Sequence, residues 1–123
     1  MNQSGKSVAK AMQKYTGGHL NHSQLIVLHD SLEHRIMNCS PKYQGSAEGH
    51  NGVRSCINHM STIDNFMRIR LGIGKPKNGS PGQYVLDQLP FNEERFWKGE
   101  GTEMVWDIIA KRIMDLESGK ETQ

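Results

Sequence analysis

The sequence has few cysteines and no long apolar stretch. Its 123 residues include two cysteines, Cys39 and Cys56, whose spacing is not that of metal ligands. So few cysteines fit a reducing compartment, in which both thiols stay free or buried. The longest uninterrupted apolar run is the four residues Leu25 to Leu28, whereas a membrane-spanning helix needs about 20. These absences exclude a membrane-spanning segment and leave no expected metal site.

The amino end also lacks the features of a targeting segment. Residues 1–5 are polar and no apolar stretch follows them, unlike a secretory signal. A mitochondrial presequence would be rich in arginine, and the first arginine is Arg35. We therefore expect a soluble, cytoplasmic protein, and a mitochondrial location would require a presequence upstream of Met1. The formal net charge of +2 is a mild bias and does not by itself indicate a nucleic-acid partner.

The apolar residues that are present fall in periodic runs typical of alternating helices and strands. The pattern predicts helices over residues 4–15, 52–61, 81–89, 91–97 and from 102 onward. It predicts a strand covered on both faces over 24–28 and a second strand over 66–73. The stretch 32–42 is ambiguous, because its apolar residues suggest a strand that Ser40-Pro41 breaks. We expect one α/β domain over residues 1–123, with a sheet that is thin for so many helices.

The most distinctive stretch is Gly49-His50-Asn51-Gly52, in which two glycines bracket a histidine and an asparagine. Glycines at this spacing predict a sharp turn. Apolar residues follow at helical spacing: Val53, Cys56, Ile57 and Met60. Asn51 is therefore expected to be the N-cap of a helix, whose first N–H groups, together with Arg54, favour an anion or a polarised carbonyl. The structural alternative is that these residues only form a turn and a cap.

Five segments follow one another in order over residues 1–90. They are Met1-Asn2-x-Ser4-Gly5, Val27-x-His29-Asp30-x-Leu32, Gly49-His50-Asn51-Gly52-Val53-Arg54-Ser55, Arg68-Ile69-Arg70-Leu71-Gly72-Ile73-Gly74 and Tyr84-Val85-Leu86. In this order and spacing they resemble the bacterial-type peptidyl-tRNA hydrolase family. The resemblance implies an open, mixed α/β sheet with helices on both faces. It also implies hydrolysis of the ester between a peptide and the terminal ribose of tRNA, without a metal or another cofactor.

The resemblance assigns three residues to catalysis. Asn2 would help to place the attacking water, and Asp30 would orient the catalytic histidine. Asn51 would bind the peptide or its carbonyl and shape the environment of the oxyanion. The structural alternatives are a frayed terminus for Asn2 and a strand-end turn for Asp30.

The resemblance also assigns residues to substrate binding. His50 lies beside Asn51 in the same motif, and Lys42 and Arg70 would form a basic clamp for the tRNA 5′-phosphate. The alternative for the two cations is an ordinary solvated charge. The sequence departs from the family in the loop before Gly49, where Glu48 adds an anion beside the expected site. We expect a monomer whose partner is peptidyl-tRNA, with no metal and no membrane contact.

The larger departure lies at the amino end. The family's catalytic histidine and another active-site asparagine precede the Met-Asn motif, and this chain begins at that methionine. We therefore expect an amino-terminal truncation, a start codon assigned late or a shortened isoform, and an incomplete sheet. His29 or His50 acting as the base is an alternative, as is a non-catalytic RNA-binding remnant or a fragment without a stable fold.

Overall fold

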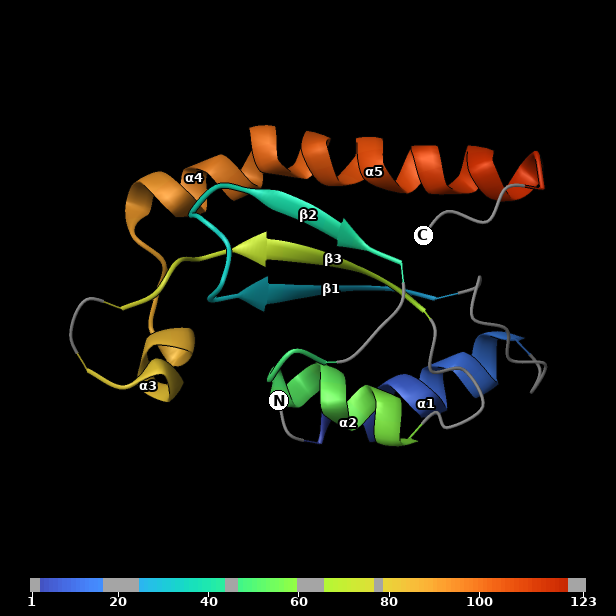
Figure 1. The fold of residues 1–123 in the computed structure, drawn as a ribbon, viewed down its shortest axis with the longest axis horizontal. Coiled ribbons are helices and arrows are strands. Elements are labelled where there is room, and N and C mark those ends of the chain that lie inside the picture. Colours follow the sequence, from blue (N-terminus) through green and yellow to red (C-terminus); the bar gives the residue numbers. More distant parts are fainter. Residues whose placement is uncertain (1–2, 17–24, 44–46, 60–65, 77–78, 120–123) are drawn as a thin grey trace. The chain divides into compact units, whose positions relative to one another are not determined.

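The computed structural model describes residues 3–16, 25–43, 47–59, 66–76 and 79–119. In chain order these form α1 (Ser4–Thr16), β1 (Ile26–Ser31), β2 (Cys39–Lys42), α2 (Asn51–His59), β3 (Met67–Gly72), α3 (Pro81–Leu86), α4 (Phe91–Lys98) and α5 (Glu100–Glu117). The strands form one sheet in the order β1-β3-β2. Figure 1 shows β1 and β3 running in one direction and β2 in the other, so the sheet is mixed. The predicted α/β fold with an open mixed sheet is confirmed.

The chain divides into two compact units. The first comprises residues 1–27, 42–68 and 123, and the second comprises residues 28–41 and 69–122. Helices α1 and α2 belong to the first unit, whereas α3, α4, α5 and most strand residues belong to the second. Each unit has buried apolar side chains of its own, such as Met12 and Phe66 in the first and Ile69 and Val105 in the second. No described helix is both long and apolar enough to cross a bilayer.

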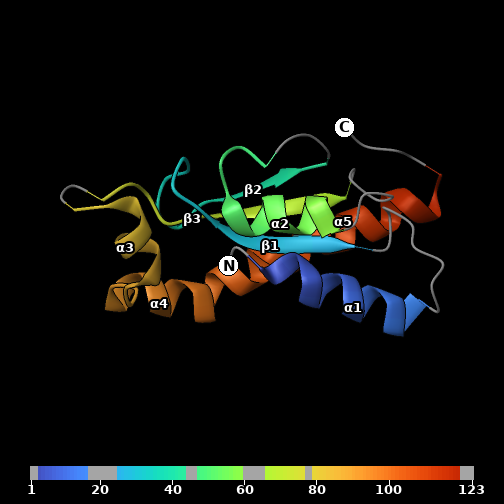
Figure 2. The ribbon, with the colours of Figure 1, turned by 90° about the horizontal axis from the view of Figure 1, so that it is seen from below.

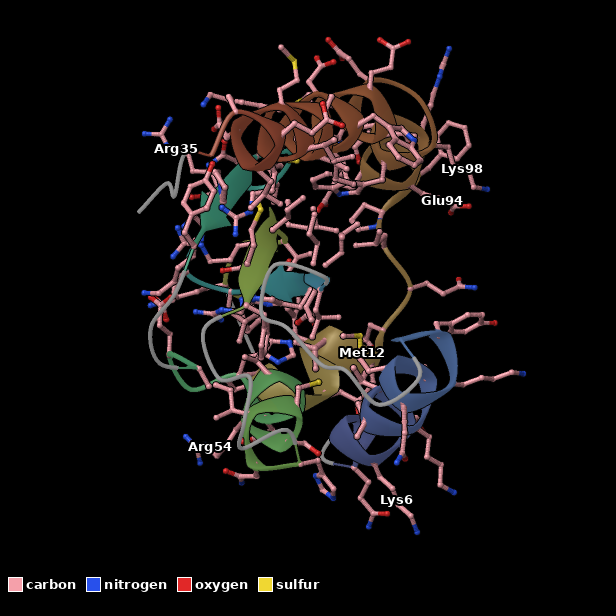
Figure 3. The ribbon with its side chains drawn as sticks, turned by 90° about the vertical axis from the view of Figure 1, so that its right-hand side faces the viewer. Lys6, Met12, Arg35, Arg54, Glu94 and Lys98 are labelled. Atoms are coloured by element: carbon pink, nitrogen blue, oxygen red, sulfur yellow. The ribbon has the colours of Figure 1, made fainter. Side chains whose placement is uncertain are left out.

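In the first unit, α1 and α2 pack closely because α1 carries a glycine where the two helices meet. A Cβ on Gly5 would lie 2.0 Å from the backbone oxygen of Ser55. The Gly5 N–H instead donates a 3.0 Å hydrogen bond to the Ser55 hydroxyl. Met12 packs into a cluster with Cys56 and Phe66, and Figure 3 shows its side chain on the opposite side of α1 from that of Lys6. The helix expected over residues 4–15 is confirmed, with its amino end fixed by this contact.

The ambiguous stretch 32–42 resolves into a loop followed by β2. Ser40-Pro41 lies inside this strand, so the expectation that it breaks a strand is wrong. Proline lacks the N–H that a central strand needs, but β2 stands at the edge of the sheet, where that donor is not required. The Gly72 N–H donates to the Asn38 carbonyl at 2.8 Å just before the strand begins.

Strand β1 begins later and extends further than the expected 24–28, so it includes both His29 and Asp30. The expected cover on both faces is also wrong, because Leu28 is 46% exposed. Leu28 lines a pocket of about 410 Å³ in the second unit, together with Leu71 and residues of α4 and α5, including Trp106. The four-residue apolar run is therefore only partly covered, with Leu28 exposed.

The last two helices are almost continuous, as Figure 2 shows. Gly99 alone separates α4 from α5 and serves as the C-cap of one and the N-cap of the other. The expected interruption was longer, over residues 99–101. Gly101 is instead helical and buried. A Cβ there would lie 2.5 Å from the Trp97 ring, so the position favours glycine. The helix expected after Ser80-Pro81 is present, and the Ser80 hydroxyl caps it, although it ends at Leu86 rather than Leu89.

Candidate functional site

The turn before α2 makes histidine, not asparagine, the helix cap. The His50 N–H donates to the Ala47 carbonyl at 3.0 Å, which closes the turn. The His50 ring then accepts the Val53 N–H on Nδ1 at 3.1 Å, and the His50 carbonyl accepts the Arg54 N–H at 2.9 Å. These are the hydrogen bonds of an N-cap residue. Asn51 is the first helical residue, so the expectation that it caps the helix is wrong by one position.

This shift leaves the Asn51 side chain at the exposed amino end of α2. Asn51 is exposed, whereas Gly52 and Val53 behind it are buried. Arg54 is exposed on the same turn, and Figure 3 shows its side chain projecting away from the helix. The first turn of α2 carries no acidic residue, so its N–H groups and these side chains favour an anion or a polarised carbonyl.

A three-residue ion cluster lies beside this turn. Glu48 Oε1 lies 3.0 Å from Lys42 Nζ and 3.1 Å from Arg68 Nη2. The Arg68 side chain is 2% exposed and that of Glu48 is 41% exposed, so the carboxylate joins a buried cation to the surface. Glu48 has a left-handed backbone with φ 53°, and Gly49 follows with φ 85°. Lys42, one of the expected phosphate contacts, is therefore paired with a carboxylate.

Sequence reasoning identified Glu48 as an anion near the site but missed its buried partner. Arg68 lies in an otherwise apolar segment between Met67 and Ile69, both fully buried. A charge inside a buried strand requires a counter-ion, and this was the available signal. It pointed to a buried ion pair rather than to a second solvated charge.

In the second unit, Asp30 is partly buried near the end of β1. The preceding His29 contacts the backbone carbonyl of Asp30 through Nδ1 at 2.8 Å. A carbonyl can only accept a hydrogen bond, so Nδ1 of His29 carries the proton. The next polar pair along the chain is the Ser31 hydroxyl and His34 Nδ1, at 2.7 Å. Polar groups therefore gather where β1 ends, as expected from the sequence.

Arg70 is held by the neighbouring edge strand. Its Nη2 donates to the Ser40 hydroxyl at 2.7 Å and to the Pro41 carbonyl at 3.3 Å, and its Nε donates to the Ser40 carbonyl at 3.3 Å. The side chain is partly buried. Arg70 therefore joins β3 to β2, a structural role that the sequence alone did not predict.

The predicted site residues fall into two sets. Lys42, His50 and Asn51 belong to the first unit, and Asp30 and Arg70 belong to the second. Asn2 lies outside the described residues. In the first unit, the polar groups gather at the turn before α2. In the second, they lie on β1 and at the contact between β3 and β2.

The described residues give no support to cysteine or metal chemistry. Burial raises the pKa of the Cys39 and Cys56 thiols, so both stay protonated near neutral pH and neither is a reactive thiolate. Among these residues, no three His, Cys, Asp or Glu side chains are grouped closely enough to share a metal ion.

Comparison with known proteins gives one consistent result. The model of the family described as "Peptidyl-tRNA hydrolase" matches residues 1–118. The peptidyl-tRNA hydrolase of Shouchella clausii is 41% identical over 97 residues, which are 78% of this chain and 50% of that protein. The peptidyl-tRNA hydrolase of Oceanobacillus iheyensis is 40% identical over 119 residues, which are 96% of this chain and 57% of that protein.

A solved structure agrees with these relatives. The crystal structure of peptidyl-tRNA hydrolase from Acinetobacter baumannii matches with a TM-score of 0.66 and 33% identity. The match covers 80% of this chain and 48% of that one. The chain thus spans about half the length of the relatives that it matches.

Proposed function

Because the chain belongs to the peptidyl-tRNA hydrolase family, we propose that it takes part in hydrolysis of the ester between a peptide and tRNA, the reaction that recycles the tRNA. The observation that best supports this proposal is the arrangement at the start of α2. His50 caps the helix and Asn51 is exposed beside it. The asparagine amide is therefore not required as a cap and is available to a substrate.

The proposed reaction is attack of a water on the ester carbonyl, assisted by a general base and by donors that stabilise the oxyanion. The Asn51 amide N–H groups would donate to the peptide or to the carbonyl oxygen. The Asp30 carboxylate would orient an imidazole and fix its tautomer. Asn2 would help to place the water. Each of these roles follows from the family resemblance.

We expect the base to be the family's own histidine, which precedes the Met-Asn motif. Of His29 and His50, His29 is the better substitute. Its Nδ1 carries the proton, so Nε2 keeps the lone pair that a base needs. In His50, Nδ1 accepts the Val53 N–H, so the neutral ring is protonated on Nε2. Proton transfer to His50 would therefore break the cap of α2.

For the substrate, we propose that Lys42 and Arg70 contact phosphate. The partner is peptidyl-tRNA, bound by a monomer in the cytoplasm. The alternative function is RNA binding without hydrolysis. If the protein has no general base, Lys42 and Arg70 would still support RNA binding, because phosphate contacts need no general base.

The test is a side-by-side assay of peptidyl-tRNA ester cleavage. It compares this chain with a version extended upstream by the amino-terminal segment of a relative. If the base lies outside residues 1–123, these residues alone should be slower by about 10²–10⁴-fold, the usual effect of losing a positioned acid–base group. Circular dichroism during urea unfolding checks that both proteins fold cooperatively.

Comparable rates from the two proteins would contradict the expected need for an external base. His29→Gln would then be the decisive variant, with His50→Gln as its matched control. Tight tRNA binding without cleavage by either protein would favour the alternative function.

A further inference from the structure

The ion cluster beside α2 contains a carboxylate where a phosphate would be expected to bind. Glu48 Oε1 lies between the Lys42 ammonium, at 3.0 Å, and the Arg68 guanidinium, at 3.1 Å. One carboxylate oxygen thus contacts two cations. A phosphate oxygen makes the same kind of charge-assisted hydrogen bond to either group.

The two cations differ in how they can respond to a competing anion. Arg68 is 2% exposed and needs a counter-ion, because an unpaired buried charge is strongly unfavourable. Lys42 is 26% exposed, so its ammonium can be reached from solvent. An incoming phosphate would therefore contact Lys42 first and would compete with Glu48 for it.

Glu48 lies in a tight turn from which its side chain reaches solvent. A φ of 53° is in the left-handed region, which a glutamate adopts at some energetic cost. Gly49 follows with φ 85° and the Glu48 side chain is 41% exposed. The partly exposed carboxylate can therefore give up Lys42 to a competing anion while it keeps its contact with the buried Arg68.

We propose that Glu48 acts as an internal competitor for phosphate at Lys42, so that an RNA phosphate binds by displacing this carboxylate from Lys42 while it stays the counter-ion of Arg68. The inference rests on the proposed function, since it concerns the same Lys42. It makes Glu48 a determinant of RNA affinity that acts through Lys42, in addition to its role as a counter-ion of Arg68.

The test measures binding of a 5′-phosphorylated RNA minihelix and of the same RNA with a 5′-hydroxyl, at several salt concentrations. Glu48→Gln keeps an acceptor for Arg68 but removes the charge. It should bind the phosphorylated RNA about two- to fivefold more tightly, the range expected for loss of an exposed competing ion pair. The salt dependence should steepen by up to about one unit of log–log slope.

Two further variants separate competition from general charge effects. Glu94→Gln removes the same charge from an exposed pair on α4, where Glu94 and Lys98 lie 2.7 Å apart and project together in Figure 3. It should change binding far less. In a Lys42→Ala background, the gain from Glu48→Gln should disappear, because the competed cation is gone.

Glu48→Asp provides a check if Glu48→Gln does not fold, as judged by circular dichroism. It keeps the charge but withdraws it from Lys42 by one methylene, so it should also tighten RNA binding, by a smaller factor than Glu48→Gln.

The inference is overturned if folded Glu48 variants bind no more tightly than wild type, if Glu94→Gln gives an equal gain, or if the gain persists without Lys42. If the inference is overturned but Lys42→Ala still weakens binding of the phosphorylated RNA, the proposed contact between Lys42 and phosphate stands. If neither the wild type nor any variant distinguishes the 5′-phosphate from the 5′-hydroxyl, both the phosphate contact and the competition by Glu48 are wrong.

Discussion

The two cations that the family resemblance assigns to phosphate are held by different kinds of partner. Lys42, in the first unit, pairs with the half-exposed carboxylate of Glu48. Arg70, in the second unit, donates to the hydroxyl and carbonyls of Ser40 and Pro41. An exposed carboxylate can be exchanged for another anion, whereas a strand backbone cannot be exchanged without opening the sheet. We therefore expect Lys42 to give up its partner to another anion more readily than Arg70 does, and Arg70 to contribute more to the stability of the sheet.

The largest expected effect tests whether, in the first unit, Asn51 contacts the substrate while the neighbouring His50 stabilises α2. In a protein extended with a relative's amino-terminal segment, Asn51→Ala should lower the rate of ester cleavage by about 10²–10³-fold, as loss of an oxyanion donor does. Its stability should change little, because Asn51 is exposed and does not cap α2. His50→Ala should instead lower stability by about 1 kcal/mol through loss of the cap.

Cleavage assays and urea unfolding of both variants measure this contrast. Asn51→Ser adds a sharper control, since it removes the amide while the His50 cap stays. Full activity of the Ser variant would contradict the proposed role of Asn51.

The second prediction tests the structural role of Arg70. Arg70→Ala removes three hydrogen bonds from a charged donor to β2, and the free energy of unfolding should fall by about 2–3 kcal/mol. Arg35→Ala is the matched control, because Arg35 is exposed and its side chain projects outward in Figure 3. It should change stability by less than about 0.5 kcal/mol. Equal losses of stability in Arg70→Ala and Arg35→Ala would contradict the structural role of Arg70, which is what distinguishes it from Lys42.

A smaller effect on stability is expected from Lys42→Ala. The pair with Glu48 is partly exposed, so its loss should lower the free energy of unfolding by about 0.5 kcal/mol or less. RNA binding should nevertheless lose up to about one unit of its log–log salt slope. Urea unfolding and binding titrations at several salt concentrations measure both. A large loss of stability with an unchanged slope would assign Lys42 to the fold instead.

The smallest effect concerns the two thiols, one in each unit. Burial raises the pKa of Cys39 and Cys56, whereas an unfolded cysteine titrates near pH 8.5. Their contribution to stability is therefore complete below about pH 8.5 and is lost as the pH rises through the folded-state pKa. Urea midpoints at pH 8 and pH 10 should show this loss. A double Cys39→Ala, Cys56→Ala variant should lack that part of the pH dependence.

The sequence predicted those helices and strands for which the spacing of apolar residues and the capping or turn residues at the ends indicate the same element. Ser80-Pro81 predicted the start of α3 because a hydroxyl cap and a proline in the first turn act locally. Strand β2 could not be recognised, because Pro41 is tolerated only through the position of its strand at the sheet edge. A tertiary position of this kind leaves no signal in a short stretch of sequence.

The site shows the same limit at the level of single residues. The motif predicted a turn and a helix start, both of which are present, but residue preference favours Asn51 over His50 as the cap. The hydrogen bond from His50 to Ala47 sets the turn one residue earlier. Arg68 was part of a recognised motif, yet its pairing with Glu48 joins residues 20 positions apart and depends on how the loop returns to the strand.

Pro41 has a consequence for how the sheet meets other chains. The described sheet has β1 at one edge and β2 at the other. An exposed edge presents unpaired backbone groups that can template the addition of a foreign strand, and a proline interrupts that row of donors. The β2 edge is therefore protected against aggregation by strand addition, whereas β1, with the sequence IVLHDS, contains no proline. Of the two outer strands described, β2 is therefore the poorer template for an added strand, because Pro41 offers no N–H there.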